Sequence, residues 1–196
     1  MKEGLDPREI RSLESIKNAY FNMLTSSETI SIKTLCESAN ITRPTFYKHY
    51  SSINELMDKF SEEMLSDLTS HIAVQQKMAI RDLSSTNLPE NMVSLFKHIK
   101  DNHSFYEMFL LQNRKTKFAK EFKRIIRSFV EEGIGAAQES GMTVIVPKDI
   151  LIQYATGAFL EVIISWLADL DRYTPEELTE ILLKISISGP YIEDIS

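Results

Sequence analysis

Glycine, proline and cysteine are scarce in this chain, which contains six Gly, six Pro and one Cys among 196 residues. Few residues therefore interrupt regular structure, and the composition favours helices over most of the length. The only cysteine, Cys36, has no partner for an intramolecular disulfide, so we expect it to be a small core residue in a reducing compartment. These absences predict an all-α protein of the cytoplasm.

Long apolar runs are also missing. No continuous apolar stretch approaches the roughly 18 residues that a membrane-spanning helix needs, and no charged-then-apolar leader with a cleavage site is present. We therefore expect neither secretion nor association with a membrane.

Signatures of catalysis and of metal binding are absent from the sequence as well. It has no Gly-rich phosphate loop, no nucleophile elbow and no recognisable metal-binding spacing. His98 and His103 are five positions apart and do not share a helical face. His103 and Glu107 do share one, but such a pair is more often a surface hydrogen bond than half of a metal site. We expect no enzyme activity, no cofactor and no metal.

Residues 31–50 instead predict two short helices joined by a tight turn. Apolar residues recur at helical spacing until Asn40 interrupts them, and Phe46 and Tyr50 then share one face of the following segment. Asn tolerates the left-handed backbone conformation of a sharp helix exit. Ser31 provides an N-cap for the first helix. This arrangement is a helix-turn-helix.

The second helix of the pair has Thr42 as its N-cap and Pro44 in its first turn, where a missing N–H costs little. Its outward face suits nucleic acid: Arg can read guanine, Lys and His neutralise phosphate, hydroxyl groups donate to phosphate, and a Pro ring meets a thymine methyl. The predicted DNA-binding residues, one of them on the preceding helix, are Lys33, Thr42, Arg43, Pro44, Thr45, Tyr47, Lys48 and His49. The alternative is an ordinary helical hairpin with a solvated basic face.

The net charge of −6 does not contradict DNA binding, because the charge is unevenly distributed. Residues 31–50 contain three Lys or Arg residues against Glu37 alone. Salt confines electrostatic effects to about 8–10 Å, so a local basic face on an acidic protein can still bind phosphate.

The segment at residues 10–56 resembles the N-terminal domain of the TetR family of bacterial transcriptional regulators. Its most specific part is the run TFYKHY at residues 45–50. The resemblance covers about the first quarter of the chain. It implies a three-helix DNA-binding domain followed by a C-terminal helical bundle, and a ligand-responsive repressor that binds a palindromic operator as a homodimer. Asn40 replaces the usual turn glycine, and Ile53 replaces the usual lysine of the next helix.

The Ile53 substitution removes a candidate phosphate contact. It favours an alternative function, a helical co-regulator or protein-interaction module that has lost operator binding.

We divide the chain into a helix-turn-helix DNA-binding domain at residues 1–52 and a ligand-sensing and dimerisation domain at residues 53–196. A connector helix is expected from Ile53 to about Arg81, followed by a break at residues 82–90. Further helices are expected near residues 92–100, after 102, and over 115–139, 148–170 and 174–186.

Large aromatic residues are numerous in the C-terminal half. We predict that six of them form the walls of a pocket for a mostly apolar small molecule: Phe96, Phe105, Phe109, Phe122, Tyr154 and Phe159. The alternative is that they only fill a core, as aromatic stripes at helical spacing usually do. The resemblance to ligand-responsive regulators favours the pocket.

The helix expected over residues 148–170 has apolar residues on two sides, so a single intramolecular neighbour cannot cover it. We expect a two-fold partner to cover the rest and to build a four-helix interface with the last helix. The predicted interface residues are Ala155, Gly157, Ala158, Val162, Trp166, Leu178, Ile181 and Leu182.

Overall fold

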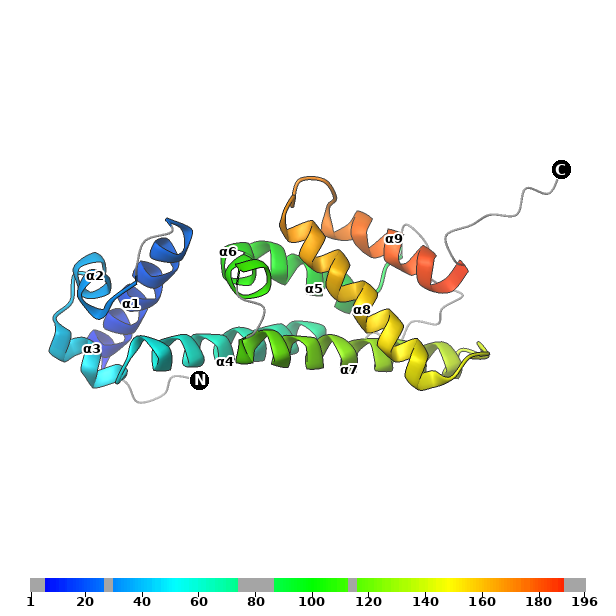
Figure 1. Cartoon of the computed structure of the whole chain (residues 1–196), viewed down its shortest axis with the longest axis horizontal. Coiled ribbons are helices and arrows are strands. Elements are labelled where there is room, and N and C mark those ends of the chain that lie inside the picture. The colour runs from blue at the N-terminus through cyan, green and yellow to red at the C-terminus, as the bar shows by residue number, and fades with distance from the viewer. Residues whose placement is uncertain (1–5, 27–29, 74–86, 113–115, 189–196) are drawn as a thin grey trace. The chain divides into compact units, whose positions relative to one another are not determined.

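The computed structural model describes residues 6–26, 30–73, 87–112 and 116–188. These residues form helices and no β-strand (Figure 1), which confirms the all-α fold class. The chain divides into two compact units, Met1–Met64 and Leu65–Ser196. The division falls inside α4 (Ile53–Ile72) rather than at its start, since Phe60 of α4 still packs in the first unit.

The N-terminal unit contains α1 (Pro7–Thr25), α2 (Ile32–Ser38), α3 (Arg43–His49) and the first turns of α4. Its core is built around rings from three of these segments. Tyr20 lies 5.5 Å from Phe60, and Tyr50 lies 5.8 Å from Phe46 and 6.2 Å from Phe60, measured between ring centroids. Aromatic pairs of this kind stabilise the fold by about 0.5–1.5 kcal/mol each beyond the burial of their apolar surface. They hold α1 and the C-terminal end of α3 against α4.

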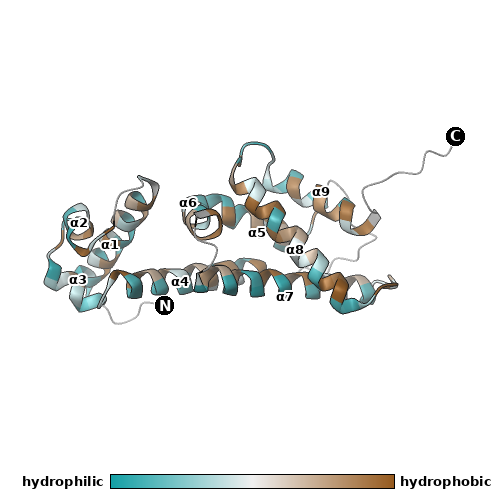
Figure 2. Ribbon diagram, viewed as in Figure 1, coloured by the Kyte–Doolittle hydropathy of each residue, from teal (hydrophilic) through white to brown (hydrophobic). Residues whose placement is uncertain are grey.

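The C-terminal unit contains α5 (Glu90–Asp101), α6 (His103–Glu107), the π-helical turn η2 (Met108–Gln112), α7 (Lys117–Glu139), α8 (Lys148–Leu167) and α9 (Pro175–Ser188). Within this unit, α7 packs on α8 and α5 packs on α9. Figure 2 shows hydrophobic and hydrophilic residues on opposite sides of α7, as expected of a helix that is buried along one face.

An aromatic cluster fills the space between α6, η2 and α7. Phe105 lies 4.6 Å from Phe109 and 5.0 Å from Phe118, and Tyr106 lies 5.4 Å from Phe122, again between centroids. All five side chains are buried. The aromatic residues at the centre of this unit therefore pack against one another.

Helix ends agree with the expected ones to within about three residues where the structure describes them. α8 stops at Leu167 instead of residue 170, because the Trp166 indole N–H donates to the Tyr173 carbonyl at 2.9 Å and fixes the turn into α9. α4 ends at Ile72. The predicted continuation of this helix to Arg81, and residues 82–86 of the predicted break, lie outside the described residues.

Helix α8 is long and apolar enough to cross a membrane by length and composition alone. Core helices of proteins that never enter a membrane pass the same test. Only 33% of its most apolar 18-residue window is buried within the described chain. The expectation that this helix has uncovered apolar surface is therefore confirmed.

Candidate nucleic-acid interface and apolar cavity

The turn between α2 and α3 has a defined backbone geometry. Asn40 has a φ of 52°, in the left-handed region, as the sequence predicts. The Asn40 amide donates to the Glu37 carbonyl at 3.2 Å, and the Ile41 amide donates to the Cys36 carbonyl at 3.0 Å. These two bonds form a Schellman motif, which satisfies carbonyl groups that the end of a helix otherwise leaves unpaired.

Both predicted N-caps are confirmed. The Ser31 hydroxyl accepts from the Thr34 amide at 3.1 Å, and the Thr34 hydroxyl accepts from the Ser31 amide at 3.0 Å, which completes a capping box. At the next helix, the Thr42 hydroxyl accepts from the Thr45 amide at 3.3 Å. Hydrogen bonds therefore fix the start of α2 and, on both sides of the turn, the end of α2 and the start of α3.

The predicted DNA-binding residues occupy one side of α3, its cap and the neighbouring α2. Phe46 is fully buried, whereas Tyr47 beside it is 57% exposed. Thr45 and His49 are half-buried. The remaining predicted residues are exposed: Lys33, Thr42, Arg43, Pro44 and Lys48. The structure therefore brings together a guanidinium, two ammonium groups, an imidazole and several hydroxyl groups beside a buried anchor.

One of these cations already has a protein partner. The Lys48 ammonium forms an ion pair with the Glu9 carboxylate of α1. Their hydrogen bond and mutual attraction raise the pKa of Lys48 and lower the pKa of Glu9. Any phosphate bound by Lys48 must therefore compete with Glu9.

Lys59 of α4 is a basic residue near α3 that the sequence did not identify. Its ammonium donates to the His49 carbonyl at 3.3 Å, lies 5.1 Å from the Tyr50 ring centroid and pairs with Glu55 at 3.0 Å. The three contacts place a positive charge at the C-terminal end of α3. Its spacing in the chain gave no signal, because the contact depends on how α4 packs on α3.

The C-terminal unit contains an apolar cavity of about 260 Å³ between α5, α7, α8 and α9. Its larger apolar lining residues include Met92, Phe129, Val130, Ile134, Phe159 and Leu183. Of the six predicted pocket residues, only Phe159 lines it.

The other five predicted pocket residues do not line this cavity, and the prediction is corrected for them. Phe105, Phe109 and Phe122 belong to the packed aromatic cluster, and Phe96 contacts the Trp166 ring at 5.7 Å. Tyr154 is 73% exposed. The aromatic side chains fill space or face outward, so they do not surround this cavity.

A second apolar hollow lies between α8 and α9. Five of the eight predicted interface residues line it: Val162, Trp166, Leu178, Ile181 and Leu182. Ala155 lines the cavity described above instead, whereas Gly157 and Ala158 are exposed. A Cβ added at Gly157 would meet nothing within 4 Å, so no helix of the described chain approaches that glycine closely.

Comparison with known proteins identifies related sequences. A TetR C-terminal family model, described as the C-terminal region of transcriptional regulators, matches residues 86–188. An HTH-type transcriptional regulator, YxbF of Bacillus subtilis (strain 168), is 26% identical over 76 residues. That alignment covers 37% of this chain and 20% of the relative, so the chain spans about a fifth of the length of the curated relative it matches.

Solved structures share the fold. A TetR transcriptional regulator from Streptococcus agalactiae 2603V has a TM-score of 0.63 and 23% identity, with 91% of this chain and 94% of that chain covered. The regulator FadR from Bacillus subtilis, in complex with stearoyl-CoA, has a TM-score of 0.63 and 16% identity, with coverage of 91% and 99%. At these identities the likeness shows the arrangement of helices alone.

Proposed function

This chain belongs to the TetR family of transcriptional regulators, and we propose that it binds a palindromic operator as a homodimer and acts as a ligand-responsive repressor in the cytoplasm. The observation that supports operator binding best is the exposed polar side of α3 beside the buried Phe46. The protein would then act by binding and not by catalysis.

Three residues on α3 have distinct roles in this proposal. Arg43 is exposed at the first position of the helix, where its planar guanidinium can read guanine. Tyr47 lies one turn further on, where its hydroxyl can donate to a phosphate oxygen. Lys48 supplies a charge whose interaction with DNA is independent of sequence.

A salt-dependent DNA-binding experiment tests these roles. The operator is first selected from genomic fragments, and its affinity is then measured by fluorescence anisotropy at several salt concentrations. Arg43→Ala should cost about 1–3 kcal/mol on the operator and relax specificity, whereas Lys48→Ala should weaken all DNA evenly and flatten the salt dependence. Arg124→Ala, an exposed arginine of the other unit, is the matched control. Wild-type affinity in both α3 variants would refute the assignment.

The dimer proposal rests on the uncovered surface of α8 and on the hollow between α8 and α9. Exposed apolar surface on this scale is unfavourable in water, and a second copy of the same helices would cover it. Gly157 and Ala158 would allow the two copies of α8 to approach closely.

Sedimentation velocity tests the dimer. Wild-type protein should sediment as a dimer at micromolar concentration, and Val162→Glu should release monomer because it buries an unpaired charge in the interface. Ser128→Glu adds the same charge to the exposed side of α7 and should leave the dimer intact. A monomeric wild type would rule out the proposed interface, and with it the spacing of about 34 Å between recognition helices that a dimer implies.

The apolar cavity supports a mostly apolar effector. Its volume of about 260 Å³ lies just below the roughly 300–1,000 Å³ of typical ligand pockets. A small apolar molecule, or part of an acyl chain, is the class that this lining suits. The FadR relative was solved with stearoyl-CoA, so acyl compounds are the first class to test.

Cavity-filling variants separate this location from the aromatic cluster. We expect medium-chain acyl compounds to stabilise the wild type against heat, and Ala137→Phe, which places a ring in the cavity, should abolish that stabilisation. Phe105→Leu alters the aromatic cluster outside the cavity and should leave that stabilisation in place. Equal responses in both variants would place the effector elsewhere.

A helical co-regulator that has lost operator binding is the second candidate. Ile53 stands where the family usually has lysine, and Glu9 forms an ion pair with Lys48, one of the few cations of α3. Both features reduce the positive charge available to DNA. Retention of a specific complex in excess competitor DNA supports the repressor, and its complete loss at physiological salt supports the co-regulator.

A further inference from the structure

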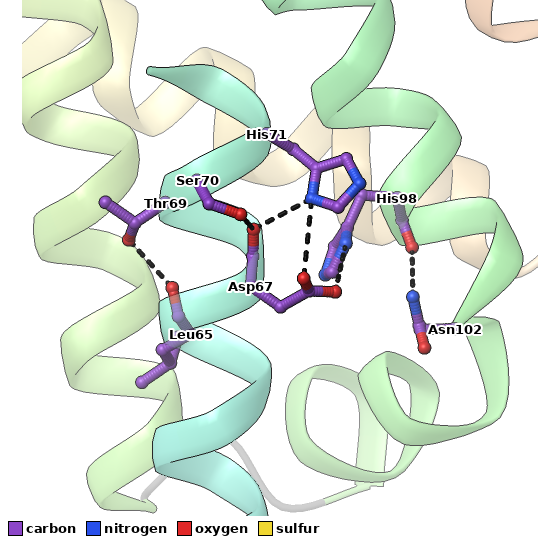
Figure 3. A network of polar contacts seen from close by, with 7 residues as sticks. All are labelled: Leu65, Asp67, Thr69, Ser70, His71, His98 and Asn102. Atoms are coloured by element: carbon purple, nitrogen blue, oxygen red, sulfur yellow. Dashed lines mark hydrogen bonds and ion pairs between the residues drawn. The ribbon is translucent and has the colours of Figure 1, made fainter. Parts of the chain in front are cut away.

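Two histidines and an aspartate meet in the C-terminal unit, at the contact of the last turns of α4 with α5 (Figure 3). The Nδ1 atom of His98 lies 3.5 Å from one carboxylate oxygen of Asp67, and the Nδ1 atom of His71 lies 3.7 Å from the other. One ligand atom from each of the three residues lies within 4.8 Å of the other two.

His98 distinguishes this cluster from an ordinary surface ion pair. Its side chain is only 1% exposed, and its Nε2 atom has no hydrogen-bond partner among the described residues. Its Nδ1 contact with Asp67 is at the outer limit of a hydrogen bond. The buried Tyr106 ring packs against the His98 ring in a T-shaped contact, with the centroids 5.8 Å apart. Buried polar groups are normally hydrogen-bonded, so the long Nδ1 contact leaves this atom poorly satisfied, and an ion between it and the Asp67 carboxylate would satisfy it.

We propose that Asp67, His71 and His98 bind one divalent transition-metal ion of the Zn²⁺, Co²⁺ and Ni²⁺ class. Bond lengths of about 2.0–2.2 Å in a tetrahedral site separate neighbouring ligand atoms by about 3.4 Å. The observed separations of 3.5 and 3.7 Å, one to each oxygen of the Asp67 carboxylate, are close to this spacing, and the full set of three ligand atoms, within 4.8 Å of one another, would contract slightly on binding. Two imidazoles and one carboxylate suit these ions, whereas Mg²⁺ and Ca²⁺ prefer oxygen ligands throughout.

The surroundings leave the site accessible and only partly preorganised. Asp67 and His71 are exposed, so a fourth position remains open to water or to an exogenous ligand. They are four residues apart on α4 and therefore share a face of that helix. His71 Nδ1 also lies 2.8 Å from the Asp67 carbonyl oxygen, and a metal bound through Nδ1 would replace this contact.

A bound ion would join the C-terminal turns of α4 to α5. Asp67 and His71 belong to a helix that begins in the N-terminal unit, and His98 belongs to the core of the C-terminal unit. The ion would therefore stabilise the packing of α4 on α5. This effect is independent of operator binding and of the identity of the apolar effector.

Titration of the full-length chain, free of any polyhistidine tag, with Co²⁺ tests the site. The visible absorption of tetrahedral Co²⁺ should saturate at one ion per chain, and Zn²⁺ should displace it. Loss of an outer-shell partner alone weakens metal sites about 10–100-fold, so Asp67→Asn and His71→Ala should each lose at least about tenfold in affinity.

Both substituted residues are exposed, so these variants should fold, and unchanged far-UV circular dichroism verifies that they do. His103→Ala removes an exposed imidazole of α6 outside the cluster and should bind Co²⁺ like the wild type. Thermal unfolding of the wild type followed by Trp166 fluorescence should shift upward with Zn²⁺. Absence of saturable binding, or equal affinity in all four proteins, would overturn the proposal.

Discussion

The turn between α2 and α3 allows a quantitative prediction about Asn40. A residue with a Cβ atom pays about 1–2 kcal/mol in the left-handed region, whereas asparagine pays less and glycine pays almost nothing. The chain cannot relax to another conformation without breaking the bonds from the Asn40 and Ile41 amides to α2. Asn40→Ala should therefore lower the free energy of unfolding of the N-terminal unit by about 1 kcal/mol.

Glycine at the same position should have a much smaller effect. The relief of backbone strain in Asn40→Gly is offset by the greater freedom of the unfolded chain, so the net change should stay within about 0.5 kcal/mol. The order of stability expected at this position is therefore glycine close to asparagine, with alanine below both.

Gly141 provides an internal comparison, because the same motif ends α7. Gly141 has a φ of 93°, its amide donates to the Gln138 carbonyl at 3.0 Å, and the Met142 amide donates to the Ala137 carbonyl at 3.1 Å. A Cβ added at Gly141 meets nothing within 4 Å, so Gly141→Ala changes only the backbone energy. We expect a loss of about 1 kcal/mol or more in the C-terminal unit.

Urea unfolding with two probes separates the units. Trp166 is the only tryptophan and lies in the C-terminal unit, so its fluorescence should detect Gly141→Ala, while far-UV circular dichroism reports on both units. Asn40→Ala should shift only the circular dichroism transition if the two units unfold independently. An Asn40→Ala variant as stable as the wild type, or more stable than Asn40→Gly, would refute the backbone argument.

Three further predictions concern packing, acid stability and charge. Phe122→Ala should cost about 3–5 kcal/mol, measured by urea unfolding with Trp166 fluorescence, because Phe122 is fully buried against Tyr106. Hydrogen bonds from the Ser51 hydroxyl and amide lower the pKa of Glu55 from 4.5 to about 2, so its stabilisation is complete above pH 4.5 and is lost as the pH falls toward 2. Unfolding of Glu55→Gln should accordingly depend less on pH between 5 and 2. Glu9→Gln should release Lys48 and tighten DNA binding at low salt, and this gain should vanish when Lys48 is also replaced by Ala.

The sequence predicted the helix-turn-helix well because its determinants are local. Each capping bond and each bond of the turn joins residues no more than five positions apart, so the residue types alone indicate them. The ion pair between Lys48 and Glu9 spans 39 positions, and the contact of Lys59 with His49 depends on the packing of α4. Such contacts are set by tertiary structure, and no spacing rule reveals them.

The metal cluster was missed for a related reason. Histidine spacing gives no metal signal in the sequence, because His98 and His103 are five positions apart and lie on different helices. The spacing of Asp67 and His71 was present as a local signal, but a carboxylate and an imidazole four residues apart are common on helix surfaces. Only the packing of α5 brings the buried His98, 27 residues beyond His71, to the same place.

The position of the apolar cavity shows why a count of aromatic residues misdirects a search for pockets in a helical bundle. A large ring fills volume, and several rings of suitable spacing pack edge to face, as Tyr106 and Phe118 do with Phe105. A hollow forms where facing helices have small side chains. Here Gly133, Ala136 and Ala137 recur at helical spacing on α7 and line the cavity together with Ala155 of α8. The sequence signal for this cavity is therefore a set of small residues at helical spacing on two neighbouring helices.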